Sequence, residues 1–266
     1  MTPSKTALLM FFLMGSFPIY PALSQESVVP PLNQLILAEI KTMPSGGGYS
    51  AGSTATQALH NAVRLSNTSQ IEDTSSLVVD ASRAMPSYCS GATYLVFLKV
   101  IAALQASHDL TLSPSLLETL RPMGQPDGTG IWGRWNANGP GTARLFAELG
   151  LGSNFTDYSR ARPGDFLKIW WGDFIGASEH GHSVIYMGTE IRDRIPYLTY
   201  WSSNVPGGFG TRSVPLSRIH RMLFSRLENP GLLTRADLLP PSDHYLYSLQ
   251  TSSSTPDEMA TLCKIH

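Results

Sequence analysis

The residues best suited to chemistry in this sequence are one cysteine and one histidine, each at the start of a predicted element. Cys89 stands in the segment Tyr-Cys-Ser-Gly, directly before a strongly apolar stretch. His182 stands in Gly-His-Ser-Val-Ile-Tyr-Met-Gly, at the head of an apolar run that is typical of a strand. A helix N-terminus stabilises a thiolate, and a neighbouring imidazole can accept the proton of the thiol and later protonate a leaving amine. This pair therefore predicts nucleophilic catalysis by a cysteine.

A third segment lies between these two along the chain. Residues 162–166 (Arg-Pro-Gly-Asp-Phe) form a predicted turn that leads into a strand. In this order the three segments resemble the NlpC-type cell-wall peptidases, a branch of the papain-like cysteine peptidases that also includes the CHAP amidases. In that family an Asp-Cys-Ser-Gly motif opens a helix, a Pro-Gly-Asp-Leu turn leads into a strand, and the general base begins a His-Val-Gly-Ile-Tyr-Leu-Gly strand. The resemblance covers residues 80–205, about half of the chain.

The resemblance implies a papain-like α+β fold, in which the helix that carries Cys89 packs on an antiparallel sheet that carries His182. It also implies attack of the Cys89 thiolate on an amide, a thioester intermediate and hydrolysis by water, without a metal or an organic cofactor. The implied substrate is peptidoglycan, cleaved in its stem peptide or at the sugar–peptide amide. The chain departs from the family where Tyr88 replaces the usual Asp and where an insert at 121–142 lengthens the interval between Cys and His.

The residue that would orient the imidazole is expected on the next strand, where the family places a polar side chain. Counting motif positions leads to Trp201, whose indole has no acceptor atom and so cannot accept the second ring N–H. Among the polar residues that follow, Asn204 carries an amide carbonyl and stands before a turn, and Ser202 is the alternative. We therefore expect Asn204 to complete the site.

Other interpretations of the same residues stay open. Cys89 could be an inert buried thiol or form a disulfide with Cys263, and His182 could be structural. A zinc site of His180, His182 and Cys89 offers too few spaced ligands. The same Cys–His pair would also serve an acyltransferase or a transglutaminase-like enzyme, in which an amine replaces water. A catalytically inactive cell-wall binding module, with Cys89 bridged to Cys263, is the alternative outside catalysis.

Between the two histidines, the position of the apolar run decides. His182 stands just before that run, where the family places its base, whereas His180 lies at the end of the preceding loop. We therefore expect His182, and not His180, to act as the base.

Tryptophans in the insert at 121–142 are the candidates for substrate binding. Trp132 and Trp135, with Asn136 and Asn138, would line a groove for a sugar or a peptide, or would instead pack the insert against the sheet. Asp165 is expected to be structural, because it caps the turn into its strand.

Helices come first along the chain and strands second, which is typical of an α+β fold. Helices are predicted at 35–42, 53–65, 92–104, 113–120 and 141–149, and strands at 165–171, 183–187 and 197–201. Apolar residues surround the helix at 92–104, which predicts that it is buried on nearly all sides. The Gly-rich residues 44–50 are expected to form a flexible loop, and the chain from residue 239 is expected to be poorly ordered.

Residues 1–24 have the pattern of a signal peptide. Lys5 precedes an apolar run too short to span a bilayer, and Ala22-Leu23-Ser24 forms a small-x-small cleavage site. We therefore expect export to the periplasm or the exterior, with a mature chain that starts near Gln25 and contains no membrane span. The remainder is divided into an N-terminal extension (25–79), a papain-like catalytic domain (80–238) and a C-terminal tail (239–266).

Composition excludes several classes of protein. The chain has 266 residues, of which 42% are hydrophobic and 15% are charged, and its net charge is −1. The charged share lies well below the average of about 25% for soluble proteins. This balance argues against a disordered chain, a coiled coil or a nucleic-acid-binding surface, so no nucleic acid is expected as a partner. The partner that the family resemblance implies is peptidoglycan or a peptide.

Overall fold

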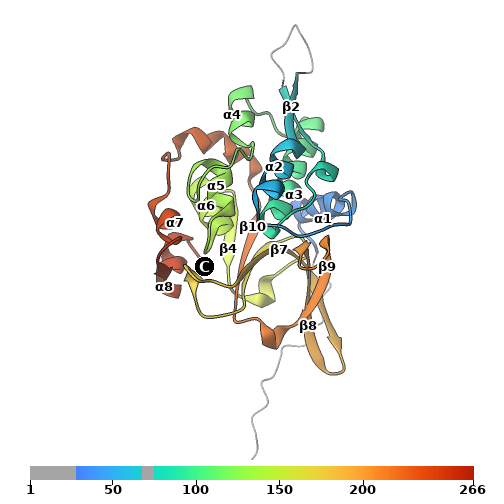
Figure 1. Cartoon of the computed structure of the whole chain (residues 1–266), viewed down its shortest axis with the longest axis vertical. Coiled ribbons are helices and arrows are strands. Elements are labelled where there is room, and N and C mark those ends of the chain that lie inside the picture. Colours follow the sequence, from blue (N-terminus) through green and yellow to red (C-terminus); the bar gives the residue numbers. More distant parts are fainter. Residues whose placement is uncertain (1–27, 68–74) are drawn as a thin grey trace, which may run out of the picture.

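A computed structural model describes residues 28–67 and 75–266. The predicted signal peptide at 1–24 lies outside the described residues. Helices pack against an antiparallel sheet (Figure 1), and the sheet has seven strands in the order β1-β9-β8-β7-β5-β10-β4. The expectation of a mixed α+β fold with a helix layer on a large antiparallel sheet is thereby confirmed.

The three strands predicted from the sequence form the centre of this sheet. β5 (Phe166–Trp170), β7 (Gly181–Arg192) and β8 (Ile195–Asn204) are neighbours, and all pair antiparallel. The other strands of the large sheet are β1 (Gly46–Gly47), β4 (Gly152–Phe155), β9 (Gly208–Pro215) and β10 (Arg221–Leu227). Two further pairs join β2 (Val63–Asn67) to β3 (Ser75–Val79) and β6 (Ile175–Gly176) to β11 (Ser253–Ser254).

The helices predicted from periodicity are present with small shifts at their ends. They are α1 (Pro31–Lys41), α2 (Ser53–Ala62), α3 (Cys89–Ala106), α4 (Pro114–Thr119) and α6 (Gly141–Leu149). The insert at 121–142 contains an additional helix, α5 (Gly130–Asn136), that its Gly- and Asn-rich composition did not predict. Its Arg134 is fully buried and donates to Glu148 of α6 at 2.8 Å, so a buried ion pair holds the insert in place.

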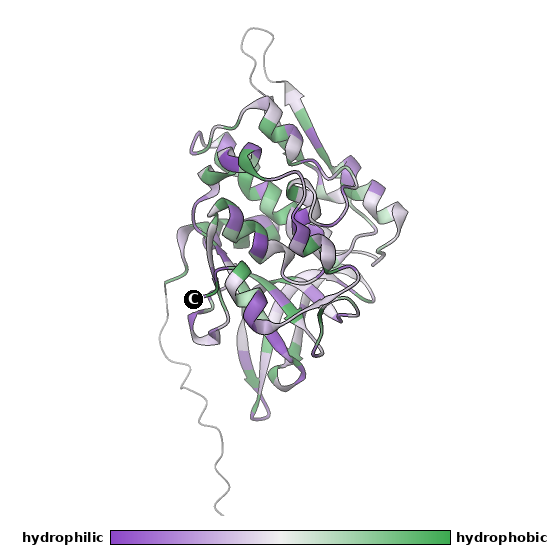
Figure 2. Ribbon diagram, turned by 90° about the vertical axis from the view of Figure 1, so that its left-hand side faces the viewer, coloured by the Kyte–Doolittle hydropathy of each residue, from purple (hydrophilic) through white to green (hydrophobic). Residues whose placement is uncertain are grey.

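α3 is the central helix of the core. Its residues 90–98 are buried, because α3 packs on β7 and β8 on one side and on α1, α5 and β3 on the others. Hydrophobic residues gather in the middle of the helical part of the molecule (Figure 2). Within residues 28–67 and 75–266, α3 is the helix that by length and composition could cross a membrane, and most of it is buried in this core.

The N-terminal segment packs into the same core as α3. Ile36 of α1, Leu59 of α2 and Leu77 of β3 are each less than 5% exposed and join the cluster of buried apolar residues around α3. α1, α2 and β3 thus form part of the apolar surroundings of α3.

The expectation of a poorly ordered C-terminal tail is wrong. Residues 239–266 form α7 (His244–Ser248), β11 and α8 (Pro256–Leu262). Asp243 accepts a 2.7 Å hydrogen bond from Arg144, and Asn154 donates to the backbone oxygen of Cys263 at 2.8 Å. The prediction failed because the polar residues of this segment hid the apolar side chains, among them Met259, that pack against the sheet.

Candidate active site

The fold brings Cys89 and His182 together. Cys89 is the first residue of α3 and is half-buried, and His182 is the second residue of β7. The thiol lies within hydrogen-bonding reach of the His182 imidazole and of the backbone N–H of Ser183. Burial raises the pKa of the Cys89 thiol, but the hydrogen bond and the charge of His182 outweigh it and bring the pKa to about 7. A large share of the cysteine is therefore thiolate at neutral pH.

Asn204 lies on the other side of the imidazole. His182 Nε2 and Asn204 Oδ1 are 3.2 Å apart. Strand pairing causes this approach, because the pairing of Ile185 with Trp201, continued three residues along each strand, sets His182 opposite Asn204. His182 also meets the ring of Tyr200 edge to face, with centroids 5.4 Å apart.

The hydrogen bonds of Asn204 define the tautomer of His182. Asn204 Nδ2 donates to the backbone oxygens of Ser202 at 3.1 Å and Gly210 at 2.8 Å, so the oxygen of the amide faces the imidazole. An oxygen can only accept, and Nε2 of His182 therefore carries the hydrogen. Nδ1 is left as the acceptor for the proton of Cys89, which is the arrangement that a general base needs.

The two alternatives weighed for these roles lie elsewhere. Ser202 donates its hydroxyl to the backbone oxygen of Ser183 at 2.7 Å and forms no hydrogen bond with the imidazole. The side chain of His180 is exposed to solvent, and its backbone oxygen accepts from Trp171 at 2.9 Å. Of the residues considered from the sequence, the structure thus groups Cys89, His182 and Asn204.

Tyr49 is a member of the site that sequence reasoning missed. Its phenol lies within hydrogen-bonding reach of the Cys89 thiol, and burial together with the negative charge of that cysteine raises the pKa of Tyr49 to about 12. The phenol is therefore a proton donor and not a phenolate. No pattern in the sequence pointed to Tyr49, because the Gly-rich segment that carries it was expected to be a flexible loop.

Backbone hydrogen bonds hold this segment on both sides of Tyr49, which corrects that expectation. The N–H of Gly48 donates to the oxygen of Gly207 at 3.1 Å, and the N–H of Ser50 donates to the oxygen of Ser87 at 3.0 Å. Ser87 in turn donates its hydroxyl to that of Ser203 at 2.8 Å, and Ser203 donates to the Ser87 oxygen. These bonds tie the segment before Cys89 to the end of β8, next to Asn204.

A buried ion pair lies beside the site. Lys168 Nζ is 2.6 Å from Glu179 Oε1, and the positive charge of Lys168 also lowers the pKa of Cys89. The second oxygen of Glu179 accepts from the backbone N–H groups of Gly139 and Gly176, each at 2.9 Å. Burial raises the pKa of this carboxyl, but Lys168, the N–H of Gly176 and the indole N–H of Trp170 outweigh it and lower the pKa. Glu179 thereby joins the insert to the loop that precedes His182.

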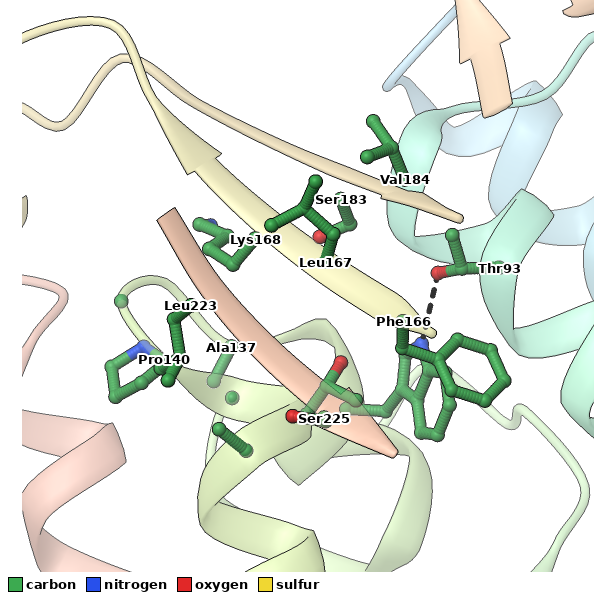
Figure 3. Close-up of a pocket in the computed structure, with 15 residues that line it drawn as sticks. Thr93, Ala137, Pro140, Phe166, Leu167, Lys168, Ser183, Val184, Leu223 and Ser225 are labelled. Atoms are coloured by element: carbon green, nitrogen blue, oxygen red, sulfur yellow. Dashed lines mark hydrogen bonds between the residues drawn. The ribbon is translucent and has the colours of Figure 1, made fainter. Parts of the chain in front are cut away.

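The prediction that Trp132 and Trp135 line a substrate groove is wrong. Each is only 1% exposed, because their rings pack against Tyr94 with centroids 5.0 and 5.3 Å apart. Trp135 donates to the Thr93 hydroxyl at 3.2 Å (Figure 3). The cavity in Figure 3, which Trp135 helps to line, has a volume of about 10 Å³. That is the space of roughly one water molecule, so no sugar or peptide fits.

Asp165 has the structural role expected of it. It is fully buried and accepts hydrogen bonds from the Arg162 N–H, Asn33 and Arg226 at 2.7–2.8 Å. These bonds hold the turn before β5 against α1 and β10.

The two cysteines are both free, which disagrees with the alternative of a disulfide between them. Cys263 is fully buried among apolar residues, and burial raises the pKa of its thiol to about 12. Cys263 is therefore an unreactive core residue. Within the described part of the chain, no group of three His, Cys, Asp or Glu side chains is arranged to hold a metal ion.

No family model, curated protein or solved structure matches this chain. What the protein does is therefore inferred from the geometry around Cys89.

Proposed function

We propose that the protein is a cysteine hydrolase that cleaves amide bonds through a thioester on Cys89, with its helix and sheet in a papain-like arrangement. The observation that supports this proposal is the hydrogen-bonded series from the Cys89 thiol through His182 to Asn204. A nucleophile, a base and a group that orients the base are the parts that cysteine-dependent acyl transfer requires.

In the proposed reaction, Nδ1 of His182 holds the proton of Cys89, and the thiolate attacks the carbonyl carbon of an amide. The C–N bond breaks when His182 protonates the leaving amine, and a thioester remains on Cys89. His182 then accepts a proton from water, whose oxygen attacks the thioester, and the acid product leaves as the thiol reforms. Asn204 stabilises the imidazolium that forms in each half of the reaction.

Two donors are available for the oxyanion of the tetrahedral intermediates. The backbone N–H of Cys89 is in the first turn of α3 and has no acceptor within the helix. The phenol of Tyr49 approaches the thiol from the neighbouring segment. Fixed donors of this kind stabilise charge as it develops on the carbonyl oxygen.

The substrate that we propose is peptidoglycan, cut at a stem-peptide bond or at the sugar–peptide amide. Support comes from the order of the segments around Cys89, Asp165 and His182, which resembles the cell-wall peptidases, and from the signal-peptide pattern at residues 1–24. An exported hydrolase would meet peptidoglycan in the periplasm or outside the cell.

Digestion of purified peptidoglycan, followed by mass spectrometry of the fragments, tests this proposal. We expect new fragments with the wild-type protein and none with the Cys89→Ala variant. Cys263→Ala is the matched control, because it removes the other free thiol without touching the site. An unchanged fragment pattern with folded wild-type protein would exclude peptidoglycan as the substrate.

A further inference from the structure

A second, larger depression lies on the side of α2 that faces solvent. It has a volume of about 490 Å³ and is lined by Ser53, Thr56, Gln57 and His60 of α2 and by Met123 and Gly124 of the loop after α4. This volume is in the range of about 300–1,000 Å³ that small-molecule sites occupy. The depression is distinct from the cavity in Figure 3, with which it shares no lining residue.

This depression, called the groove from here on, is connected to the nucleophile through Tyr88. The phenol of Tyr88 lies within hydrogen-bonding reach of the Thr56 side chain, and Tyr88 directly precedes Cys89 in the chain. Leu59 of α2 lies beside Gly91 of α3, because a Cβ atom built on Gly91 would be 3.4 Å from the Leu59 side chain, an ordinary van der Waals distance. One wall of the groove is therefore joined, through Thr56 and Tyr88, to the residue that precedes the thiol.

The two walls of the groove are held together before any ligand binds. His60 Nδ1 lies 3.2 Å from the backbone oxygen of Pro122, so α2 is linked to the loop opposite. A carbonyl only accepts, so Nδ1 carries the hydrogen and Nε2 remains an acceptor. A site that is built in advance loses less conformational entropy on binding.

The groups in the groove fit an extended peptide with uncharged side chains. None of the lining residues is Asp, Glu, Lys or Arg, and none is an aromatic residue that could stack on a sugar ring. Within the described residues, the backbone N–H and C=O of Gly124 have no hydrogen-bond partner. A free donor and a free acceptor on one exposed residue are what an extended peptide backbone pairs with. Gln57 adds a free carbonyl oxygen, since its Nε2 donates to Asn61 at 2.9 Å.

We infer that this groove binds an uncharged, extended peptide segment of the substrate and directs the adjoining amide to Cys89. The inference rests on the proposed function and adds the chemical class of substrate next to the scissile bond.

Affinity labels that alkylate Cys89 test this inference independently of hydrolysis. In each label a carbon–halogen bond breaks, the Cys89 sulfur bonds to the carbon, and halide leaves. Alanine peptides ending in a chloromethyl ketone extend on the acyl side, and bromoacetyl alanine peptides extend on the amine side. Each type is compared as a one-residue and a four-residue label, with iodoacetamide as the reference, and the modified residue is identified by mass spectrometry.

We expect the four-residue label of one type to react with Cys89 about 10-fold faster than its one-residue counterpart, relative to iodoacetamide. Gln57→Trp, which fills the groove, should abolish this gain. Thr54→Trp is the matched control, because Thr54 is also exposed on α2 but does not line the groove, and it should keep the gain. A four-residue label in which two alanines are replaced by glutamate should lose most of it.

Equal rates for long and short labels of both types, with Cys89 still alkylated by iodoacetamide, would overturn the groove and leave the proposed function intact. A gain that Gln57→Trp retains would also overturn it, because the peptide would then bind elsewhere. A Cys89 that iodoacetamide does not modify overturns the proposed function itself, and the groove proposal with it.

Discussion

Replacing Asn204 by alanine removes one contact from the site. The variant loses the acceptor that lies 3.2 Å from His182 Nε2, whereas the imidazole keeps its approach to Cys89. A hydrogen bond to a group that becomes charged contributes about 1.5–3 kcal/mol. We therefore expect turnover to fall by about 10- to 150-fold, because the imidazolium is less stable and the ring is free to adopt the wrong tautomer.

The same substitution has a separate cost in stability. Asn204 is only 3% exposed, and its Nδ2 donates to two backbone oxygens that the variant leaves without a donor. The free energy of unfolding should fall by about 1–3 kcal/mol. Asn204→Asp separates the two effects, because a carboxylate still accepts from His182 but cannot donate to the oxygens. Its turnover should exceed that of Asn204→Ala at a similar loss of stability.

The assay measures turnover as the rate at which peptidoglycan fragments are released. In parallel, it measures the rate of Cys89 alkylation as a function of pH. Thermal unfolding shows whether each variant is folded at the assay temperature. Ser202→Ala is the control, since Ser202 donates to the Ser183 backbone on the same strand pair but is not hydrogen-bonded to the imidazole. Unchanged turnover in Asn204→Ala together with a large loss in Ser202→Ala would refute the assignment of Asn204.

Three further predictions concern the neighbours of the thiol and the buried carboxyl. The alkylation rate of Cys89 should rise with pH through a midpoint near pH 7, and His182→Ala should move this midpoint upward, because it removes the hydrogen bond and charge that lower the pKa of the thiol. A wild-type midpoint near pH 9, the ordinary pKa of a thiol, contradicts this prediction. Tyr49→Phe should lower turnover by about 10-fold or more without changing thermal unfolding, because the variant lacks the hydroxyl that donates a hydrogen bond at the site. Turnover equal to that of the wild type would show that the hydroxyl has no part in the reaction. Asp165→Ala should lower the free energy of unfolding by about 3–5 kcal/mol, because the guanidinium of Arg226 loses its buried partner. Denaturant titration measures the free energy of unfolding, and a loss below about 1 kcal/mol, as for a surface ion pair, contradicts the prediction.

The helix and strands that carry the site can be predicted from the local sequence. A run of apolar residues after Cys89, too long for one strand and without a polar face, predicts a buried helix, and α3 is that helix. The apolar runs after Asp165 and His182 became the neighbouring strands β5 and β7. Periodicity and composition act over a few residues, so they are readable without the fold. The order of the segments, which resembles the cell-wall peptidases, then grouped Cys89 with His182 as candidates.

The side chains that meet around the thiol depend on strand register and on pairing between distant segments, which the local sequence does not reveal. Asn204 reaches His182 because of the register between β7 and β8, for which the sequence offered a choice of polar residues and no distance. Tyr49 reaches Cys89 because backbone groups of its Gly-rich segment pair with Gly207 and Ser87, residues far away in the chain. Trp132 and Trp135 are enclosed by Tyr94 and its neighbours and so cannot bind substrate. Backbone hydrogen bonds carry no side-chain signature, and burial depends on what the rest of the chain places around a residue, so neither can be read from the local sequence.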